Sequence, residues 1–242
     1  MNKTWLLTVV CTVAALATAF VFNPARSLAV EYQVEFVATW SNATHPSAYP
    51  ASAHFSPLIG ATHTDQVTFW EPGGISTPGI EAMAEEGDTV FLRNEFLAAG
   101  ADTDTIIRDG GVGSPGSTTE RFDVEASHSL VTLVTMVAPS PDWFVGVHGL
   151  DLRPGGNWVS QITVDLFAYD AGTDSEQDFN SANSDTNPQD PIALLGAPFT
   201  GENSAPLGTF TFTLIPEPTS LMLILLGSGF LSASSRRFYN RM

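Results

Sequence analysis

Three aspartates, Asp142, Asp170 and Asp174, are the side chains of this sequence that are best placed to bind a ligand. Each follows an apolar segment and lies in a turn-forming context, where hard oxygen ligands for a divalent cation usually gather. Residues 139–141 (Pro-Ser-Pro) stiffen the approach to Asp142, and residues 171–173 (Ala-Gly-Thr) let the other two aspartates face one point. The pattern predicts a loop-borne Ca²⁺ site, completed by backbone carbonyls and water because Ca²⁺ takes about six to eight oxygens. Mg²⁺ fits less well, since it demands a tighter octahedron.

The usual signatures of a catalytic site are missing. The sequence contains no Gly-x-Ser-x-Gly elbow and no His-Glu-x-x-His motif, and its one cysteine is Cys11 near the amino terminus. Glu85 and Glu86 are adjacent on an expected helix and point to different sides. Glu71 and Asp142 could form a glycosidase pair, although nothing in the pattern singles them out. We therefore predict that the protein is not an enzyme and assign no catalytic residue; an extracellular polysaccharide-active hydrolase is the alternative.

Two further patterns suggest chemistry and have simpler explanations. His45, His54 and His63 recur nine residues apart, which matches none of the usual short pairs of zinc ligands, so we expect structural hydrogen bonds. Residues 111–116 (GVGSPG) have the spacing of a phosphate-binding glycine motif. Because a proline interrupts this segment and no strand–helix–strand unit surrounds it, we predict a flexible hairpin or loop tip.

The charge of the chain excludes one class of partner. The segment from Val30 to Ile215 contains 25 of the 26 acidic residues, all except Glu217, and four of the nine basic residues. Its net charge is therefore −21. Such a field repels phosphate backbones and favours cations, so we expect no binding of nucleic acid. A general adaptation of exported proteins to high acidity is the simpler alternative explanation.

The amino-terminal 29 residues have the layout of a secretory signal peptide. A basic Lys3 precedes an apolar run at residues 5–22, Pro24 ends this run, and small residues follow. We predict cleavage after Ala29, with Ala19 as the alternative site; an uncleaved membrane anchor is the competing interpretation. Since Cys11 would leave with this segment, the mature protein would contain no disulfide.

Residues 30–215 are predicted to form one domain of all-β class, an antiparallel β-sandwich with one short helix. Residues 178–191 are rich in Asn, Asp and Ser and are expected to form a long surface loop. The helix is expected at residues 78–87, because a Ser-Thr-Pro start precedes an apolar stripe and a glycine ends it. The expected strands are residues 31–40, 67–70, 90–96, 105–107, 122–124, 128–137, 144–147, 158–169 and 207–214.

Five parts of the chain form a long tryptophan-rich pattern: residues 38–63, 70–74, 136–146 (MVAPSPDWFVG), Trp158 and residues 165–174 (DLFAYDAGTD). This pattern resembles the spondin domain, the amino-terminal module of F-spondin and mindin. The resemblance implies an antiparallel β-sandwich with Ca²⁺ held by the aspartates at 142, 170 and 174. Spondin domains of animals usually carry disulfides, and this chain departs from them because its domain has no cysteine. More of the stability must then come from the core and from bound metal.

Residues 216–242 resemble the PEP-CTERM sorting signal of Gram-negative bacteria. A Pro-Glu-Pro triplet at residues 216–218 precedes a short apolar run at residues 221–231, and Arg236, Arg237 and Arg241 follow. The resemblance implies a short transmembrane helix, processing by an exosortase and delivery to the cell envelope. The apolar run is shorter than the roughly 20 residues of a permanent span, which favours transient insertion. A plain tail anchor is the alternative.

The sequence therefore predicts an exported calcium-binding module of the cell envelope, cell surface or extracellular space. Ca²⁺ would neutralise the crowded aspartates and present a surface for adhesion to a glycan, a lipid head group or a protein. A purely structural role is the further alternative, in which the metal replaces the missing disulfides and no partner exists.

Overall fold

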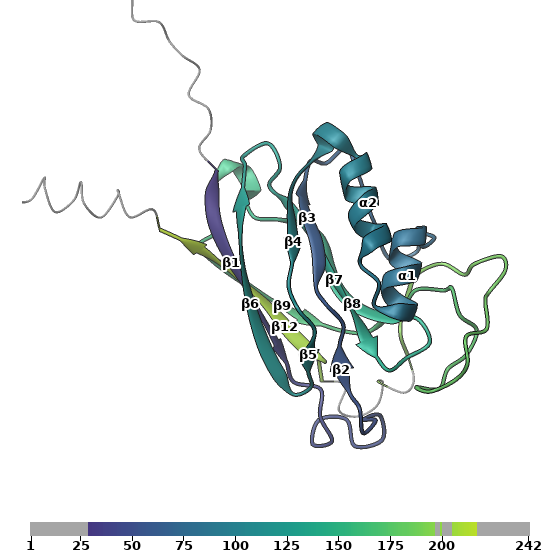
Figure 1. The fold of residues 1–242 in the computed structure, drawn as a ribbon. Coiled ribbons are helices and arrows are strands. Elements are labelled where there is room, and N and C mark those ends of the chain that lie inside the picture. Colours follow the sequence, from purple (N-terminus) through teal and green to yellow (C-terminus); the bar gives the residue numbers. More distant parts are fainter. Residues whose placement is uncertain (1–28, 197–198, 200–204, 217–242) are drawn as a thin grey trace, which may run out of the picture.

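The computed structural model describes residues 29–196, 199 and 205–216, and within them two antiparallel sheets lie face to face (Figure 1). The four-stranded sheet contains, in spatial order, β6 (Gly116–Val124), β1 (Val30–Ala38), β12 (Gly208–Ile215) and β9 (Gln161–Leu166). The eight-stranded sheet has the order β11 (Ala193–Leu194), β10 (Tyr169–Asp170), β8 (Trp143–Asp151), β7 (Leu130–Ala138), β2 (His54–Phe55) and β5 (Val112–Gly113), and β3 (Ile59–His63) pairs with both β7 and β4 (Thr103–Arg108). The predicted antiparallel β-sandwich is consistent with this architecture.

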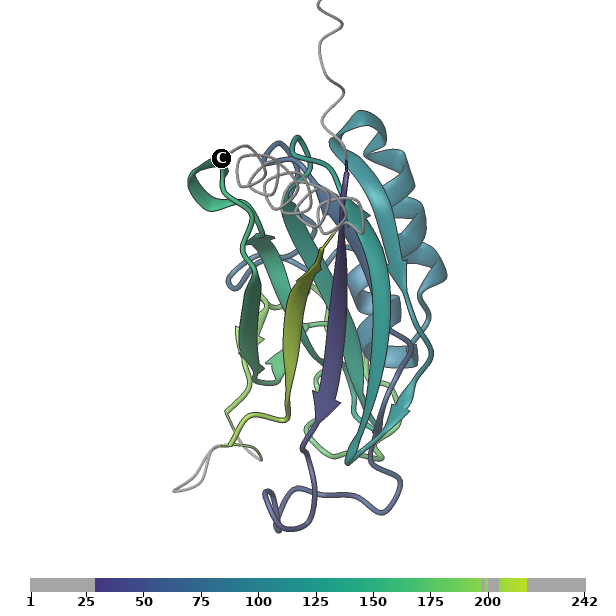
Figure 2. The same ribbon diagram turned by 90° about the vertical axis from the view of Figure 1, so that its left-hand side faces the viewer.

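Strand β7 is apolar on both faces because each face is covered by a different layer. Val131, Leu133 and Val137 belong to the cluster between the two sheets. Val134 and Met136, on the other face, pack with the helices that cover the outside of the larger sheet. Figure 2 shows the three layers in order, with the helices behind the larger sheet. Continuous burial on such a strand follows from being central in the fold.

Two α-helices form the outer layer in the described part of the chain, where the sequence predicted one. Helix α1 (Pro78–Glu86) begins and ends as predicted: the Thr77 side chain accepts a hydrogen bond from the Ile80 N–H, and Gly87 at φ 67° ends it. Helix α2 (Val90–Ala98) was expected to be a strand, and this expectation was wrong. Leu92 and Phe96 are buried four residues apart, the spacing of one helical face.

Two of the expected strands are also corrected by the structure. Residues 67–70 form an irregular segment, and Phe69 and Trp70 are buried in the helical layer without pairing in a sheet. The strand expected at residues 158–169 is β9 followed by β10. The chain leaves the smaller sheet after Leu166 and joins the larger sheet at Tyr169, so Asp170 lies beside β8.

The first and last strands place the two ends of the domain together. In the register of β1 with β12, Glu31 pairs with Ile215, and in the register of β1 with β6, Val30 pairs with Val124. The opposite ends of these strands, Ala38 and Gly208, lie roughly 25 Å away at about 3.3 Å per residue. We call the first end of the sandwich the terminal end and the other the aspartate end.

The predicted export signals fall largely outside the described residues. The signal peptide, residues 1–29, overlaps them only at Ala29, and the sorting signal, residues 216–242, only at Pro216. Within the described residues, no helix has both the length and the apolar character needed to cross a membrane.

Candidate metal centre

Asp142 lies in the turn between β7 and β8 and is completely buried. Its Oδ2 atom accepts hydrogen bonds from the backbone N–H groups of Thr173 (2.8 Å) and Asp174 (3.1 Å), and from the Thr173 hydroxyl (3.3 Å). Its Oδ1 atom is buried and has no hydrogen-bond partner. Since buried carboxylate oxygens are almost always paired in folded proteins, this atom is available to a cation or to a proton shared with Asp170.

Asp170 is brought next to Asp142 by strand pairing. It ends β10, in register with Trp143 of β8, and the Ala171 N–H donates to the Asp142 carbonyl (3.1 Å). Its Oδ1 atom accepts from the Gly172 N–H (2.8 Å), which closes a tight turn. Gly172 has φ 74°, and a side chain there would collide with the Asp190 carbonyl oxygen. Glycine is therefore required for the loop to bring the aspartates together.

Asp174 is also nearly buried, at 6 % exposure, but it is held by other groups. Its Oδ1 accepts from the Glu176 N–H (2.8 Å) and its Oδ2 from the Ser184 N–H (3.1 Å), so it orders the acidic loop at residues 174–185. The side-chain oxygens of the three predicted aspartates do not all lie within 4.8 Å of one another. Asp142 and Asp170 lie close enough for their side chains to interact directly. Asp174 instead contacts Asp142 through its backbone N–H and affects Asp170 through its charge.

The charges of this cluster raise the pKa of its buried members. Burial raises the pKa of Asp142 to about 6, and the charge of Asp170 adds to this effect, against the N–H donors of Thr173 and Asp174. Burial also raises the pKa of Asp170, with Asp190 and Asp174 adding to it, against the Gly172 N–H and a hydrogen bond from the protonated Asp142 side chain. The only ion pair among the described residues joins Arg121 to Glu31, at the terminal end. Within the described residues, no basic side chain therefore forms an ion pair with the aspartates at this end.

The sequence did not reveal that helix α1 contributes carboxylates to the same region. Asn183 donates to Glu85 (2.7 Å) and Gln189 donates to Glu81 (3.0 Å), so the loop lies against the helix face that was expected to be simply solvated. Burial raises the pKa of Glu85, and the charges of Glu81 and Asp174 raise it further. No spacing in the sequence could show this, because a long irregular loop brings these residues together.

The three regularly spaced histidines do not converge on a site. His45 Nε2 lies 3.0 Å from the Ala205 carbonyl, and His63 Nε2 lies 2.9 Å from the Thr132 hydroxyl. His54 is exposed and bonds locally to the Ser52 carbonyl (2.7 Å). These bonds agree with the expected structural role.

The donor set fits a hard divalent cation. Carboxylate oxygens from two loops meet in a buried, acidic environment, and one of them lacks any partner. The same burial argues against the glycosidase pair considered from the sequence, because a completely buried Asp142 cannot reach a polymeric substrate beside the exposed Glu71.

The fold and this site define a β-sandwich with acidic loops at one end, and comparison with known proteins assigns its family. The family model described as Spondin_N matches residues 30–207, and the chain belongs to this family. It is 39 % identical to Spondin-2 of Homo sapiens over 178 residues, which are 71 % of this chain and 54 % of the relative. It is 37 % identical to Spondin-2 of Rattus norvegicus over 180 residues, 72 % of this chain and 54 % of the relative.

A longer relative matches over the same region. Spondin-1 of Rattus norvegicus is 34 % identical over 174 residues, 68 % of this chain and 22 % of the relative. The chain therefore spans about half of one relative type and less than a quarter of the other. The family assignment confirms the resemblance to spondin domains that was seen in the sequence.

Asp142→Asn should stabilise the protein when a chelator removes divalent cations. Because the pKa of Asp142 rises from 3.8 to about 6 on folding, the folded state binds the proton more tightly. The cost of ionising this group is absent below the unfolded pKa, grows between the two pKa values, and reaches about 3 kcal/mol above the folded pKa. Neutral asparagine avoids this cost and keeps an oxygen acceptor for the Thr173 N–H.

Denaturant unfolding in chelator, at about pH 7.5 and about pH 5, measures this effect. The parent should gain stability at the lower pH relative to Asp142→Asn, and the variant should be the more stable of the two at the higher pH. Asp165→Asn, on the exposed face of β9, is the matched control and should follow the parent. If Asp142→Asn is less stable than the parent at about pH 7.5, ionised Asp142 does not destabilise the folded protein, and this explanation is wrong.

Proposed function

We propose that this chain is an exported spondin-type module that binds Ca²⁺ through Asp142, Asp170 and Asp174 and acts in adhesion or matrix interaction at the cell envelope. The observation that carries the proposal is the buried Asp142 Oδ1 atom without a partner, next to Asp170. Bound Ca²⁺ would supply the positive charge that this end of the sandwich lacks.

The chain's own groups suggest how such an ion would be held. Asp142 would offer Oδ1, while its Oδ2 stays bonded to the loop backbone. Asp170 would offer the oxygen that does not accept from Gly172. Asp174 would contribute charge and one of its remaining lone pairs, since each of its oxygens accepts a single bond. Carbonyl groups and water would complete the shell.

The ion would join two loops that are distant in sequence. The turn at residues 139–142 and the loop at residues 171–174 are already linked by backbone bonds, and a shared cation would add a link through their side chains. Ser76 donates to the Ala171 carbonyl (2.7 Å), so the segment before helix α1 would be fixed as well. Next to Ser76, Ile75 is 56 % exposed and offers an apolar contact beside the acidic loops. These loops are the proposed contact surface for a glycan, lipid head group or protein.

The position of the chain ends supports presentation of this surface away from a membrane. The sorting signal would follow Ile215 at the terminal end, roughly 25 Å from the aspartate end. An exosortase-processed protein of a Gram-negative envelope, attached or released at residues 216–242, would then carry its calcium loops outward. This sorting step rests on the Pro-Glu-Pro triplet, the short apolar run and the terminal arginines.

Calorimetric titration of the chelator-treated protein should show one Ca²⁺ ion bound per chain. Asp170→Ala removes a ligand and part of the charge, so it should weaken Ca²⁺ binding by more than about tenfold. Asp165→Ala removes one exposed negative charge on β9 and should leave the affinity nearly unchanged. The proposal fails if no heat of binding appears at millimolar Ca²⁺, or if Asp170→Ala binds as the parent does.

Adhesion should depend on both the ion and the apolar contact. In an assay of cell aggregation or attachment to the producing cells' own matrix, Ile75→Ser should reduce adhesion while Ca²⁺ affinity stays as in the parent. Leu97→Ser is the matched control, because Leu97 is similarly exposed at 52 % but lies on helix α2. If deleting the whole gene or adding chelator leaves adhesion unaltered, the metal has a structural role only.

A further inference from the structure

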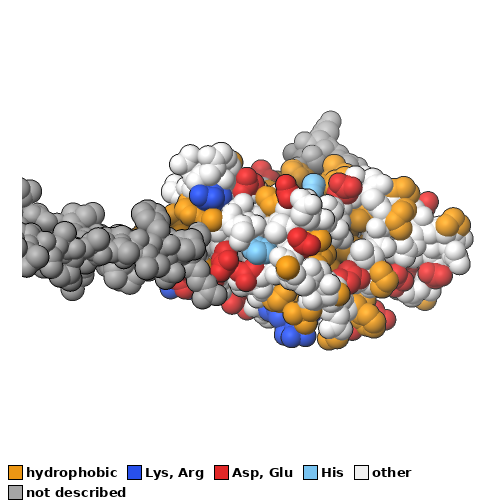
Figure 3. Space-filling view, turned by 90° about the horizontal axis from the view of Figure 1, so that it is seen from above, with side chains coloured by type: hydrophobic (Ala, Val, Ile, Leu, Met, Phe, Trp, Pro, Cys, Tyr) orange, Lys and Arg blue, Asp and Glu red, His pale blue; other side chains and the backbone are white. Residues whose placement is uncertain are grey.

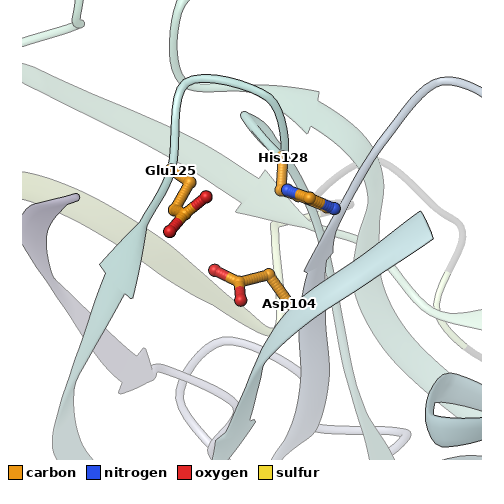
Figure 4. Close-up of side chains that lie close together, drawn as sticks. All are labelled: Asp104, Glu125 and His128. Carbon is orange, nitrogen blue, oxygen red and sulfur yellow. The ribbon is translucent and has the colours of Figure 1, made fainter. Parts of the chain in front are cut away.

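A second group of possible metal ligands lies at the terminal end of the sandwich. Asp104 projects from β4, and Glu125 and His128 come from the turn between β6 and β7. One ligand atom of each residue lies within 4.8 Å of the other two, and this is the only such group among the described residues. Figure 4 shows the carboxylates of Asp104 and Glu125 close to one another, with the His128 ring beside them. Figure 3, viewed from this end, shows histidine among acidic side chains on an open surface.

The hydrogen bonds of His128 prepare one ring nitrogen for a metal. Nε2 lies 2.9 Å from the Ala101 carbonyl, which can only accept, so Nε2 carries the proton. Nδ1 of the neutral ring then accepts a hydrogen bond from the Ser127 hydroxyl (3.0 Å), which can rotate away and release the Nδ1 lone pair to a metal. A backbone carbonyl that fixes the tautomer through the other nitrogen is the usual outer partner of a metal-bound histidine.

The two carboxylates have no positive partner among the described residues. Neither the Asp104 nor the Glu125 side chain accepts a hydrogen bond from the described residues. Neither carboxylate forms an ion pair with an arginine or with His128 in this part of the chain. The three groups are thus close, at separations that are too long for direct bonding. Ligand atoms about 2.1 Å from a zinc ion lie roughly 3.4 Å apart in a tetrahedral site, so small side-chain rotations would suffice.

Among the described residues, the histidine next to this group is not available as a further ligand. His63 is the neighbouring histidine, but it is buried, and its two nitrogens bond to the Thr64 carbonyl (2.8 Å) and the Thr132 hydroxyl (2.9 Å). In the turn between β6 and β7, the His128 N–H donates a hydrogen bond to the Glu125 carbonyl (3.0 Å). Glu125 and His128 are therefore held three residues apart on one rigid turn, opposite Asp104.

We propose that Asp104, Glu125 and His128 form a site for a divalent transition metal, with Zn²⁺ as the reference ion. An imidazole nitrogen with two carboxylates suits Zn²⁺, Co²⁺ or Mn²⁺, whereas Ca²⁺ prefers oxygen ligands alone. Water would fill the remaining positions, because the site is open to solvent.

This site would have a different mechanical role from the aspartate end. The turn between β6 and β7 carries the chain from the smaller sheet to the larger, and β4 belongs to the larger sheet. A metal bound across them would fasten the connection between the sheets, in a domain that has no cysteine for a disulfide. The two sites lie at opposite ends of β7, roughly 25 Å apart at about 3.3 Å per residue, so they share no ligand.

Titration of untagged, chelator-treated full-length protein with Zn²⁺, and with Co²⁺ followed by visible absorption, tests the proposal. The parent should bind one such ion at this site with a Co²⁺ spectrum typical of nitrogen and oxygen ligands. His128→Ala and Asp104→Asn should each weaken binding by more than about tenfold. Asp104→Asn is the safer variant for folding, because this side chain is exposed and makes no hydrogen bond.

Two controls separate this site from others. His54→Ala removes an exposed histidine elsewhere, and Asp170→Ala removes an aspartate of the proposed calcium centre; both should keep the Co²⁺ spectrum. A spectrum that survives His128→Ala, or that disappears in either control, overturns the assignment. Absence of any Co²⁺ or Zn²⁺ binding at millimolar concentration overturns it as well, whatever the outcome with Ca²⁺.

Discussion

Buried negative charge without a positive partner is the constraint on which the aspartate end depends. Asp142 is completely enclosed, yet only one of its oxygens is satisfied by the chain, and its neighbour Asp170 carries a second buried carboxylate. Such an arrangement destabilises a folded protein unless a cation or a proton compensates it. The surrounding turns are shaped to maintain it, because the backbone N–H groups of Thr173 and Asp174 hold the acid in place.

The sandwich provides the rigid frame for this arrangement. Pairing of β10 with β8 fixes Asp170 beside Trp143, and the switch of the chain from one sheet to the other after Leu166 makes that pairing possible. The same two-sheet design leaves the β6–β7 connection at the opposite end, where a second group of metal-binding side chains lies. Metals at both ends would serve the purpose that disulfides serve in small exported domains.

Sequence patterns predicted the strands whose apolar residues alternate, but they failed for segments whose secondary structure is determined by tertiary packing. The alternating apolar residues of β1 and β12 and the capped start of α1 were recognisable. Helix α2 was not, because its apolar residues fit a short strand equally well and only burial of Leu92 and Phe96 against α1 and β3 selects the helix. Proximity of Asp142 to Asp170 could be inferred from turn residues. The proximity of Asp104 to His128 could not be inferred from the sequence, because it follows from the pairing of β3 with both β4 and β7.

A crystal structure of the protein grown with Ca²⁺ tests the central claim most directly. The account predicts an ion about 2.3–2.6 Å from Asp142 Oδ1 and from a carboxylate oxygen of Asp170, with further oxygens from the loop and from water. It is contradicted if, at saturating Ca²⁺, no ion lies there and Asp142 Oδ1 instead accepts a hydrogen bond from a protein group or water.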